Sequence, residues 1–170
     1  MLHVPSPFPS LSRRQMLFGA AALALVGTAS TACGSSAPPP EVDELAAQLE
    51  RARADSQLAS DAAAATPPPP TAQALTTVAS ERSAHAQALS DELVRMVGKD
   101  APTSAATTTT APPAKAPTTQ DVIAALRESA DAATQLAAKQ SGYRAGLLGS
   151  IAAACTAAYK VALVPPGAPQ

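Results

Sequence analysis

Aromatic and charged side chains are both scarce in this chain. Aromatic residues make up 2% of it, tryptophan is missing, and the formal net charge is -1. Without a basic surplus the chain lacks the electrostatic footprint of a nucleic-acid-binding protein, so we expect no nucleic-acid partner. Hydrophobic residues still reach 46%, and most are alanine, which favours helix but buries little area per side chain. The composition therefore predicts helices around a thin core.

Cysteine and histidine are also rare. The chain holds two cysteines, Cys33 and Cys155, and two histidines, which is too few for a disulfide framework. The scattered acids and the single histidine beyond the N-terminal segment, His85, form no recognisable Ser/His/Asp spacing. Gly-rich phosphate loops are absent as well. We therefore expect that the protein is not an enzyme.

The first 32 residues have the features of an export signal. The segment Ser12-Arg13-Arg14-Gln15-Met16-Leu17-Phe18 contains paired arginines, and the apolar run that follows, from Leu17 to Val26, carries no charge. This run is shorter than the roughly 20 residues that a membrane-spanning helix needs. The segment resembles a twin-arginine signal, with Arg13 and Arg14 as the export motif. We predict that residues 1–32 are a signal peptide.

The next residues, Ser30-Thr31-Ala32-Cys33-Gly34, resemble a lipobox, although Ser30 stands where leucine is usual. The resemblance implies that Cys33 is lipidated and anchors the protein to the outer face of the cytoplasmic membrane. Two acyl chains are enough for a stable membrane anchor, whereas one chain alone binds only marginally. The alternative is an ordinary cut near Ala29 or Ala32, which would release a soluble protein. In the anchored form, residues 33–40 are a proline-rich stalk.

Apolar residues at three- and four-residue steps predict four helices, at about 41–65, 72–97, 119–140 and 143–163. We expect Gly98 to stop the second helix and Thr119 to cap the third. No charge lies between Arg144 and Lys160, so the fourth helix should be the most enclosed of the four. The first helix should place its apolar stripe on Val42, Leu45, Leu49, Ala52, Ser56 and Ala63.

The segment at about 99–118 has no apolar periodicity and contains a threonine run and several prolines. It is typical of a flexible connector, and either an O-glycosylated tract or a bare linker fits this composition. Residues 165–170 form a tail. Because the four predicted helices have similar lengths, roughly 30 to 40 Å each, we predict an all-α fold with an up-down-up-down four-helix bundle over residues 41–164.

Two segments carry a family resemblance. Ala79-Ser80-Glu81-Arg82-Ser83-Ala84-His85-Ala86-Gln87-Ala88-Leu89 and Gly142-Tyr143-Arg144-Ala145-Gly146-Leu147-Leu148-Gly149-Ser150-Ile151-Ala152-Ala153-Ala154-Cys155 resemble parts of an uncharacterised actinobacterial family described as ferritin-like. The resemblance implies a four-helix bundle and raises the question of a metal centre. A two-metal bundle needs a Glu from each of two helices and a Glu-x-x-His from each of the others. Glu81 and His85 are four residues apart and no such second pair exists, so we expect no two-metal centre.

Two interpretations of His85 stay open. Glu81, Arg82 and His85 could form a buried polar cluster that binds a ligand or a single metal ion. The simpler alternative, which we favour, is an intrahelical contact between Glu81 and His85, with Arg82 extending past the core to solvent. Cys155 lies on an apolar helix face and is expected to be a small core residue and not a reactive thiol.

These expectations leave two classes of function. The first is an exported, non-enzymatic envelope lipoprotein whose bundle is an interaction or small-ligand binding module, with the membrane and an envelope protein as partners. The second is a ferritin-like metal-binding redox or storage protein. In either class the oligomeric state stays open, because the helices could also complete their core with a partner subunit.

Overall fold

Every regular element in the part of the chain that the computed structural model describes, residues 39–66, 69–104 and 115–164, is helical. The α-helices are α1 (Pro40–Ala65), α2 (Pro69–Val97), α3 (Thr119–Ala137) and α4 (Gly142–Ala157). A 3-10 turn, η2 (Gly98–Asp100), follows α2, and a π-helical turn, η3 (Ala158–Ala162), continues α4. The predicted all-α class is confirmed. The predicted signal peptide, Cys33, most of the stalk, residues 105–114 of the connector and the tail lie outside the described residues.

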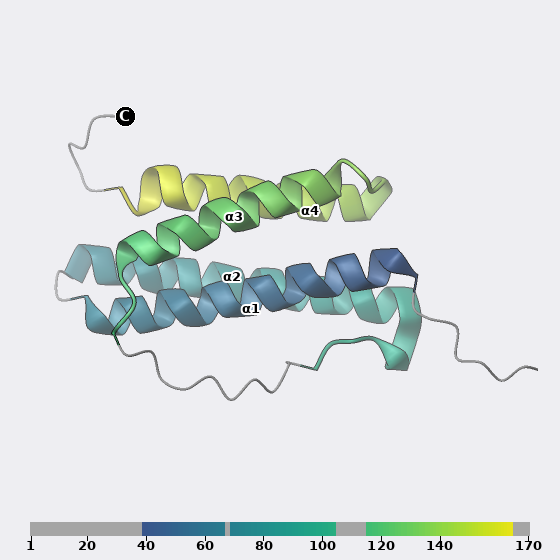
Figure 1. The fold of residues 1–170 in the computed structure, drawn as a ribbon, viewed down its shortest axis with the longest axis horizontal. Coiled ribbons are helices and arrows are strands. Elements are labelled where there is room, and N and C mark those ends of the chain that lie inside the picture. The colour runs from purple at the N-terminus through teal and green to yellow at the C-terminus, as the bar shows by residue number, and fades with distance from the viewer. Residues whose placement is uncertain (1–38, 67–68, 105–114, 165–170) are drawn as a thin grey trace, which may run out of the picture. The chain divides into compact units, whose positions relative to one another are not determined.

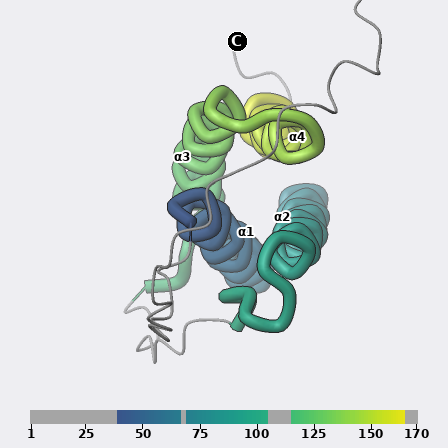
Figure 2. Tube along the Cα trace, turned by 90° about the vertical axis from the view of Figure 1, so that its right-hand side faces the viewer, coloured from purple at the N-terminus to yellow at the C-terminus, as the bar shows by residue number. Residues whose placement is uncertain are grey.

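The helices form a bundle of two layers, one with α1 and α2 and the other with α3 and α4 (Figures 1 and 2). All four belong to one compact unit, in which α1 packs against both α2 and α3, and α4 packs mainly against α3. Leucine supplies half of the twelve largest side chains that are fully buried among the described residues, at Leu49, Leu75, Leu89, Leu93, Leu126 and Leu148. The core is therefore a leucine seam with alanine filling the closer contacts.

The predicted up-down-up-down order of the helices is wrong. Lys139 at the end of α3 and Arg144 at the start of α4 pair with Glu44 and Glu41 at the start of α1. At the opposite end of the bundle, the first residues of α2 and of α3 line one cavity together with the end of η3 and the two residues that follow it. Hence α2 and α3 run in the same direction (Figure 1). This order is open to the chain because the roughly 20-residue connector is long enough to return along the bundle.

The helix ends differ from the predicted ones where local chemistry overrides the apolar pattern. The N-cap of α3 is Thr118 and not Thr119, because the Thr118 hydroxyl accepts a hydrogen bond from the Asp121 amide while the Asp121 carboxylate accepts one from the Thr118 amide. This reciprocal pair is a capping box. Gly98 ends α2 as predicted, with a φ of 68°, a left-handed conformation that favours glycine. The other boundaries moved by at most about three residues, if η3 is counted as the end of the fourth helix; the α-helical part of that helix ends at Ala157, six residues before the predicted end.

The enclosure predicted for α4 is wrong. Within α4 the residues that are buried are Leu148, Ile151, Ala152 and Cys155, whereas α1 and α2 bury longer stripes. Tyr143 at the start of α4 keeps 64% of its surface exposed, and Val161 in η3 keeps 71%. The prediction failed because freedom from charge was taken as a sign of burial, and the bundle gives α4 a close neighbour on one side.

Candidate functional site

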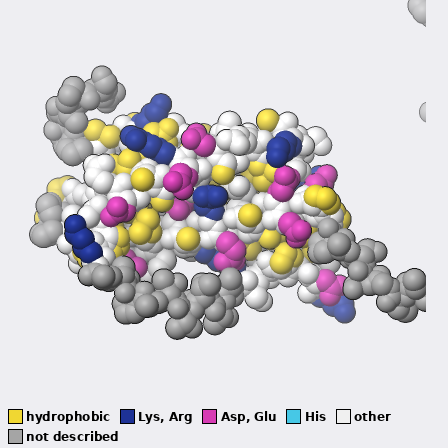
Figure 3. Space-filling model, in the orientation of Figure 1, with side chains coloured by type: hydrophobic (Ala, Val, Ile, Leu, Met, Phe, Trp, Pro, Cys, Tyr) yellow, Lys and Arg dark blue, Asp and Glu magenta, His cyan; other side chains and the backbone are white. Residues whose placement is uncertain are grey.

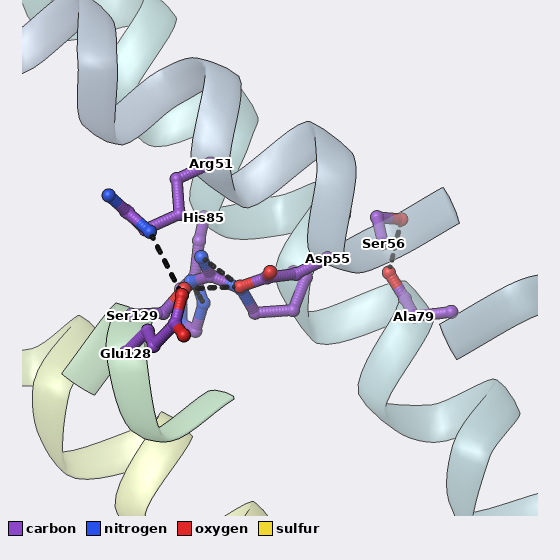
Figure 4. Close-up of polar contacts among 8 residues, drawn as sticks. Arg51, Asp55, Ser56, Ala79, His85, Glu128 and Ser129 are labelled. Carbon is purple, nitrogen blue, oxygen red and sulfur yellow. Dashed lines mark hydrogen bonds and ion pairs between the residues drawn. The ribbon is translucent and has the colours of Figure 1, made fainter. Parts of the chain in front are cut away.

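Charged and polar side chains from three helices meet inside the bundle. Asp55 of α1, Arg82 of α2 and Ser129 of α3 are each at most 5% exposed. One oxygen of Asp55, Oδ2, lies 2.9 Å from Nη2 of Arg82 and accepts hydrogen bonds from Arg82 Nε at 3.1 Å and from Ser129 Oγ at 2.5 Å (Figure 4, where Arg82 is drawn without a label). We call these residues, together with His85, the central polar cluster.

The cluster forms because neither charge could be buried alone. Moving one ion out of water costs several kcal/mol, and a partner with good hydrogen-bond geometry offsets that cost. Burial raises the pKa of Asp55, while the hydrogen bond from Ser129 and the charge of Arg82 act in the opposite direction. Arg51 lies beside the cluster and adds a weaker attraction, but its own ion pair with Glu128 is long, at 4.0 Å. The cluster therefore ties α1, α2 and α3 together at one register.

His85 joins the cluster through Arg82. Arg82 Nη1 lies 3.2 Å from His85 Nδ1. A guanidinium has donors and no acceptor, so Nδ1 accepts this hydrogen bond and the neutral ring carries its proton on Nε2. Burial, and next the charge of Arg82, lower the pKa of His85 from 6.5 to about 4. His85 is therefore neutral at physiological pH and is oriented by a cation.

Cys155 lies in the core of α4, as the sequence predicted, and is 1% exposed. Burial is the largest cause of its raised pKa, and the charges of Arg82 and Asp55 act on it as well. A raised pKa keeps the sulfur as a thiol, which is a poor nucleophile. Cys155 thus behaves as a small core residue beside the central polar cluster.

Glu81 does not belong to the cluster, and the simpler interpretation of this region is also wrong. Glu81 is exposed, and among the described residues it has neither a hydrogen bond nor an ion pair with His85. Arg82 does not extend to solvent, since its side chain is 3% exposed. Of the three predicted site residues, the structure brings together Arg82 and His85, and it adds Asp55 and Ser129.

The sequence did contain a signal for Asp55. Counting in steps of three and four from Val42 through Leu45, Leu49 and Ala52 leads to either residue 55 or residue 56. We chose Ser56, which is half-buried and donates a hydrogen bond to the carbonyl of Ala79. The buried residue is Asp55, and the stripe continues through Ala59 and Ala62. Spacing by three and four allows both positions, and the apolar pattern alone does not choose between them.

The cluster does not fit a metal ion. Within the described ranges no group of three or more His, Cys, Asp and Glu side chains is arranged to hold one. The one ring nitrogen of His85 with a hydrogen-bond partner faces the guanidinium of Arg82, a cation that would repel a metal. Glu128 and Asp131 of α3 are exposed. Figure 3 shows acidic and basic side chains scattered over the face that α1 and α3 present.

A second buried carboxylate lies near the end of α2. The Glu92 side chain is 1% exposed, and both of its oxygens accept hydrogen bonds from Arg95, at 2.6 and 2.7 Å. The Arg95 guanidinium lies 5.9 Å from the centre of the Tyr143 ring of α4. This arrangement is internally satisfied, because the arginine neutralises the acid and the ring covers the arginine. It links α2 to the start of α4.

The comparisons with known proteins give no family. No family model matches the chain, and neither a curated protein nor a solved structure matches it significantly. The fold and the cluster thus define an all-α bundle protein with a self-neutralised polar centre. The ferritin-like resemblance stays a prediction from the sequence.

Proposed function

We propose that this chain is an exported envelope lipoprotein, anchored through Cys33, whose helical bundle is a non-enzymatic interaction or small-ligand binding module. One observation carries the proposal. The arginine pair Arg13-Arg14, the uncharged run after it and the small residues before Cys33 follow each other in the order of a lipoprotein signal, a few residues before α1 begins at Pro40. The order matters because the export and processing machinery recognises these segments one after another along the chain.

The interior of the bundle supports a binding role over a catalytic one. Each buried carboxylate is neutralised by an arginine, Asp55 by the buried Arg82 and Glu92 by the exposed Arg95. His85 accepts a hydrogen bond from Arg82 and is held neutral. Groups so engaged hold helices in register, and the surface is left to make contacts with other molecules.

Fractionation of a C-terminally tagged full chain in an actinobacterial host tests the proposal. The wild-type chain should be found in the membrane fraction, and mass spectrometry of its mature N-terminal peptide should show a diacylglycerol on Cys33. The Arg13→Lys/Arg14→Lys double variant should accumulate as precursor in the cytosol. The Cys33→Ala variant should lose the lipid. A wild-type chain recovered from the cytosol with residues 1–32 intact would overturn the proposal.

A ferritin-like metal-binding redox or storage protein is the second candidate, and one observation favours it. The parallel direction of α2 and α3 requires a single long connection between the two helical hairpins, and ferritin-like bundles have one such crossover. The central polar cluster, however, does not fit a metal ion. Metal analysis of the purified protein after dialysis tests this candidate. Stoichiometric iron, manganese or zinc would support it, and metal-free protein would eliminate it.

A further inference from the structure

The helix α4 with its continuation η3 carries an apolar surface that the bundle leaves uncovered. Among the described residues, the segment Gly142–Ala162 is the one helix long and apolar enough to cross a membrane, and 28% of its most apolar window is buried. An apolar core helix of a water-soluble bundle would be mostly buried. We call the uncovered side the outer face of α4; it is lined by Tyr143, Gly146, Gly149, Ala153, Ala157 and Val161.

The outer face runs along the whole helix and meets the rest of the bundle at its two ends, where the Tyr143 ring lies against Arg95 and Val161 lines the cavity with the first residues of α2 and α3. Tyr143 and Val161 are eighteen residues apart, which is about five helical turns, so both lie on the same side of the helix. A Cβ atom added to Gly146 or Gly149 would meet nothing within 4 Å. Glycine destabilises a helix interior, and the bundle gives no packing reason for either one. Between its ends, the outer face is therefore open to contact with another surface.

The charged residues of α4 and of the chain on either side of it are basic. No acidic residue follows Asp131 in the sequence, while Lys139, Arg144 and Lys160 do. Lys139 and Arg144, near the start of α4, are paired with Glu44 and Glu41 of α1, and Lys160 lies at the other end of the helix. Lys160 is exposed, and 65% of the Lys139 side-chain surface is exposed. Tyrosines stand at both ends of the uncharged run, at Tyr143 and Tyr159. Tyrosine and basic residues at the ends of an apolar helix are typical of the interface between water and a bilayer with anionic lipids.

The proposed lipid anchor places this face within reach of a bilayer, and to this extent the inference rests on the proposed function. The start of α4 is held at the start of α1, because Nη2 of Arg144 lies 3.3 Å from Oε2 of Glu41. The residues from Cys33 to Pro39 can span at most about 25 Å when fully extended. A lipid on Cys33 would therefore keep the start of α4 near the membrane.

We propose that the outer face of α4 lies on the surface of an anionic membrane. Tyr143 and Val161 contact the headgroup region, and Lys160 lies near the lipid phosphates. The helix stays on the surface instead of crossing the bilayer, because its other side is packed in the bundle core through Leu148, Ile151 and Cys155. Small side chains bind lipid weakly. The anchor compensates for this, because it raises the local concentration of this face at the membrane.

Vesicle flotation of the mature, secreted Cys33→Ala chain tests the inference without the lipid. We expect binding to vesicles of phosphatidylglycerol and phosphatidylcholine, loss of binding with phosphatidylcholine alone, and weakening by salt. Ala153→Glu should lower the affinity about fivefold, the factor expected from one charge near an anionic surface. The matched control is Ala124→Glu, an exposed alanine of α3, which should bind like the parent. Equal binding by both variants would overturn the inference.

A labelling experiment distinguishes a bilayer from a second copy of the chain. In the Cys33→Ala chain the remaining native thiol, Cys155, is buried, so a fluorophore can be attached at Ala153→Cys or, as control, at Ala124→Cys. Brominated lipids in the anionic vesicles should quench the label at position 153 and leave that at position 124 unchanged. The inference would be overturned if light scattering showed a dimer in the absence of vesicles and position 153 were protected from labelling in that dimer. Because neither test depends on the lipid anchor at Cys33, failure of these tests is distinguishable from failure of Cys33 lipidation.

Discussion

The helices α1 and α4 use their sequences in opposite ways. The helix α1 is rich in acids and arginines, yet it buries a stripe along its whole length and even takes Asp55 into the core. The helix α4 has no acidic residue, yet much of its surface faces outward. The helix α1 lies between α2 and α3, while α4 packs closely on α3. The two helices nevertheless bury similar shares of their residues, seven of 26 in α1 and four of 16 in α4. Burial thus does not follow the polarity of a helix's own sequence.

The strongest way to break this comparison is to remove the partner of the buried acid. Arg82→Met should destabilise the protein by about 3 to 5 kcal/mol, because Asp55 would be left as an unpaired charge in the core. Urea unfolding followed by circular dichroism measures this loss. The control Arg51→Met should cost less than about 1 kcal/mol, since the ion pair of Arg51 is long and partly exposed.

A second substitution shows whether the pairing is responsible. Asp55→Leu combined with Arg82→Met should recover part of the lost stability, because neither charge of the central polar cluster is then left buried without its partner. A loss below about 1 kcal/mol for Arg82→Met alone would contradict the ion pair as the centre of the bundle. Such a result would also remove the contrast between α1 and α4.

A smaller effect should come from lowering the pH. The pKa of His85 is depressed in the folded protein, to about 4 from the ordinary 6.5, so the unfolded chain takes up the proton first. The stabilising contribution of a neutral His85 is therefore complete above pH 6.5 and is lost as the pH falls through about 4. Part of this loss is screened, because the ring is only half-buried.

Unfolding free energies of the parent and of His85→Gln between pH 7 and 4 measure this effect. The parent should lose more stability than the variant over that range, because glutamine does not titrate. Asp55 contributes in the other direction, since its raised pKa lets the folded state bind a proton earlier as the pH falls. Identical slopes for the two proteins would rule out His85 as the titrating group.

The smallest effect sharpens the comparison from the side of α4. Gly149→Ala should stabilise the protein by roughly 0.5 to 1 kcal/mol, because alanine is the better helix former and its Cβ meets nothing. Gly142→Ala is the control and should destabilise, since Gly142 has a φ of +57° that strains any residue with a Cβ. Thermal melting measures both. A loss of stability in Gly149→Ala would mean that the outer face of α4 has a close neighbour in the isolated protein.

The helices themselves could be predicted because their signals are local. Apolar spacing located all four, Gly98 ended α2, and Cys155 was placed in the core. The predicted N-cap of α3 was wrong by one residue. Either threonine can cap a helix, and the choice depends on which one pairs with Asp121 in a capping box. The cluster was half found, since Arg82 and His85 lie on one helix while Asp55 and Ser129 come from two others.

The sequence by itself determined where the chain is helical, because hydrogen bonds and side-chain spacing within a helix involve residues at most four positions apart. Only the tertiary structure decided that α2 and α3 run in parallel, that Asp55 forms an ion pair with Arg82, and that one side of α4 is left uncovered. Each of these depends on residues tens of positions apart. Helix periodicity fixes which side chains share a face, but it does not tell which helix that face meets.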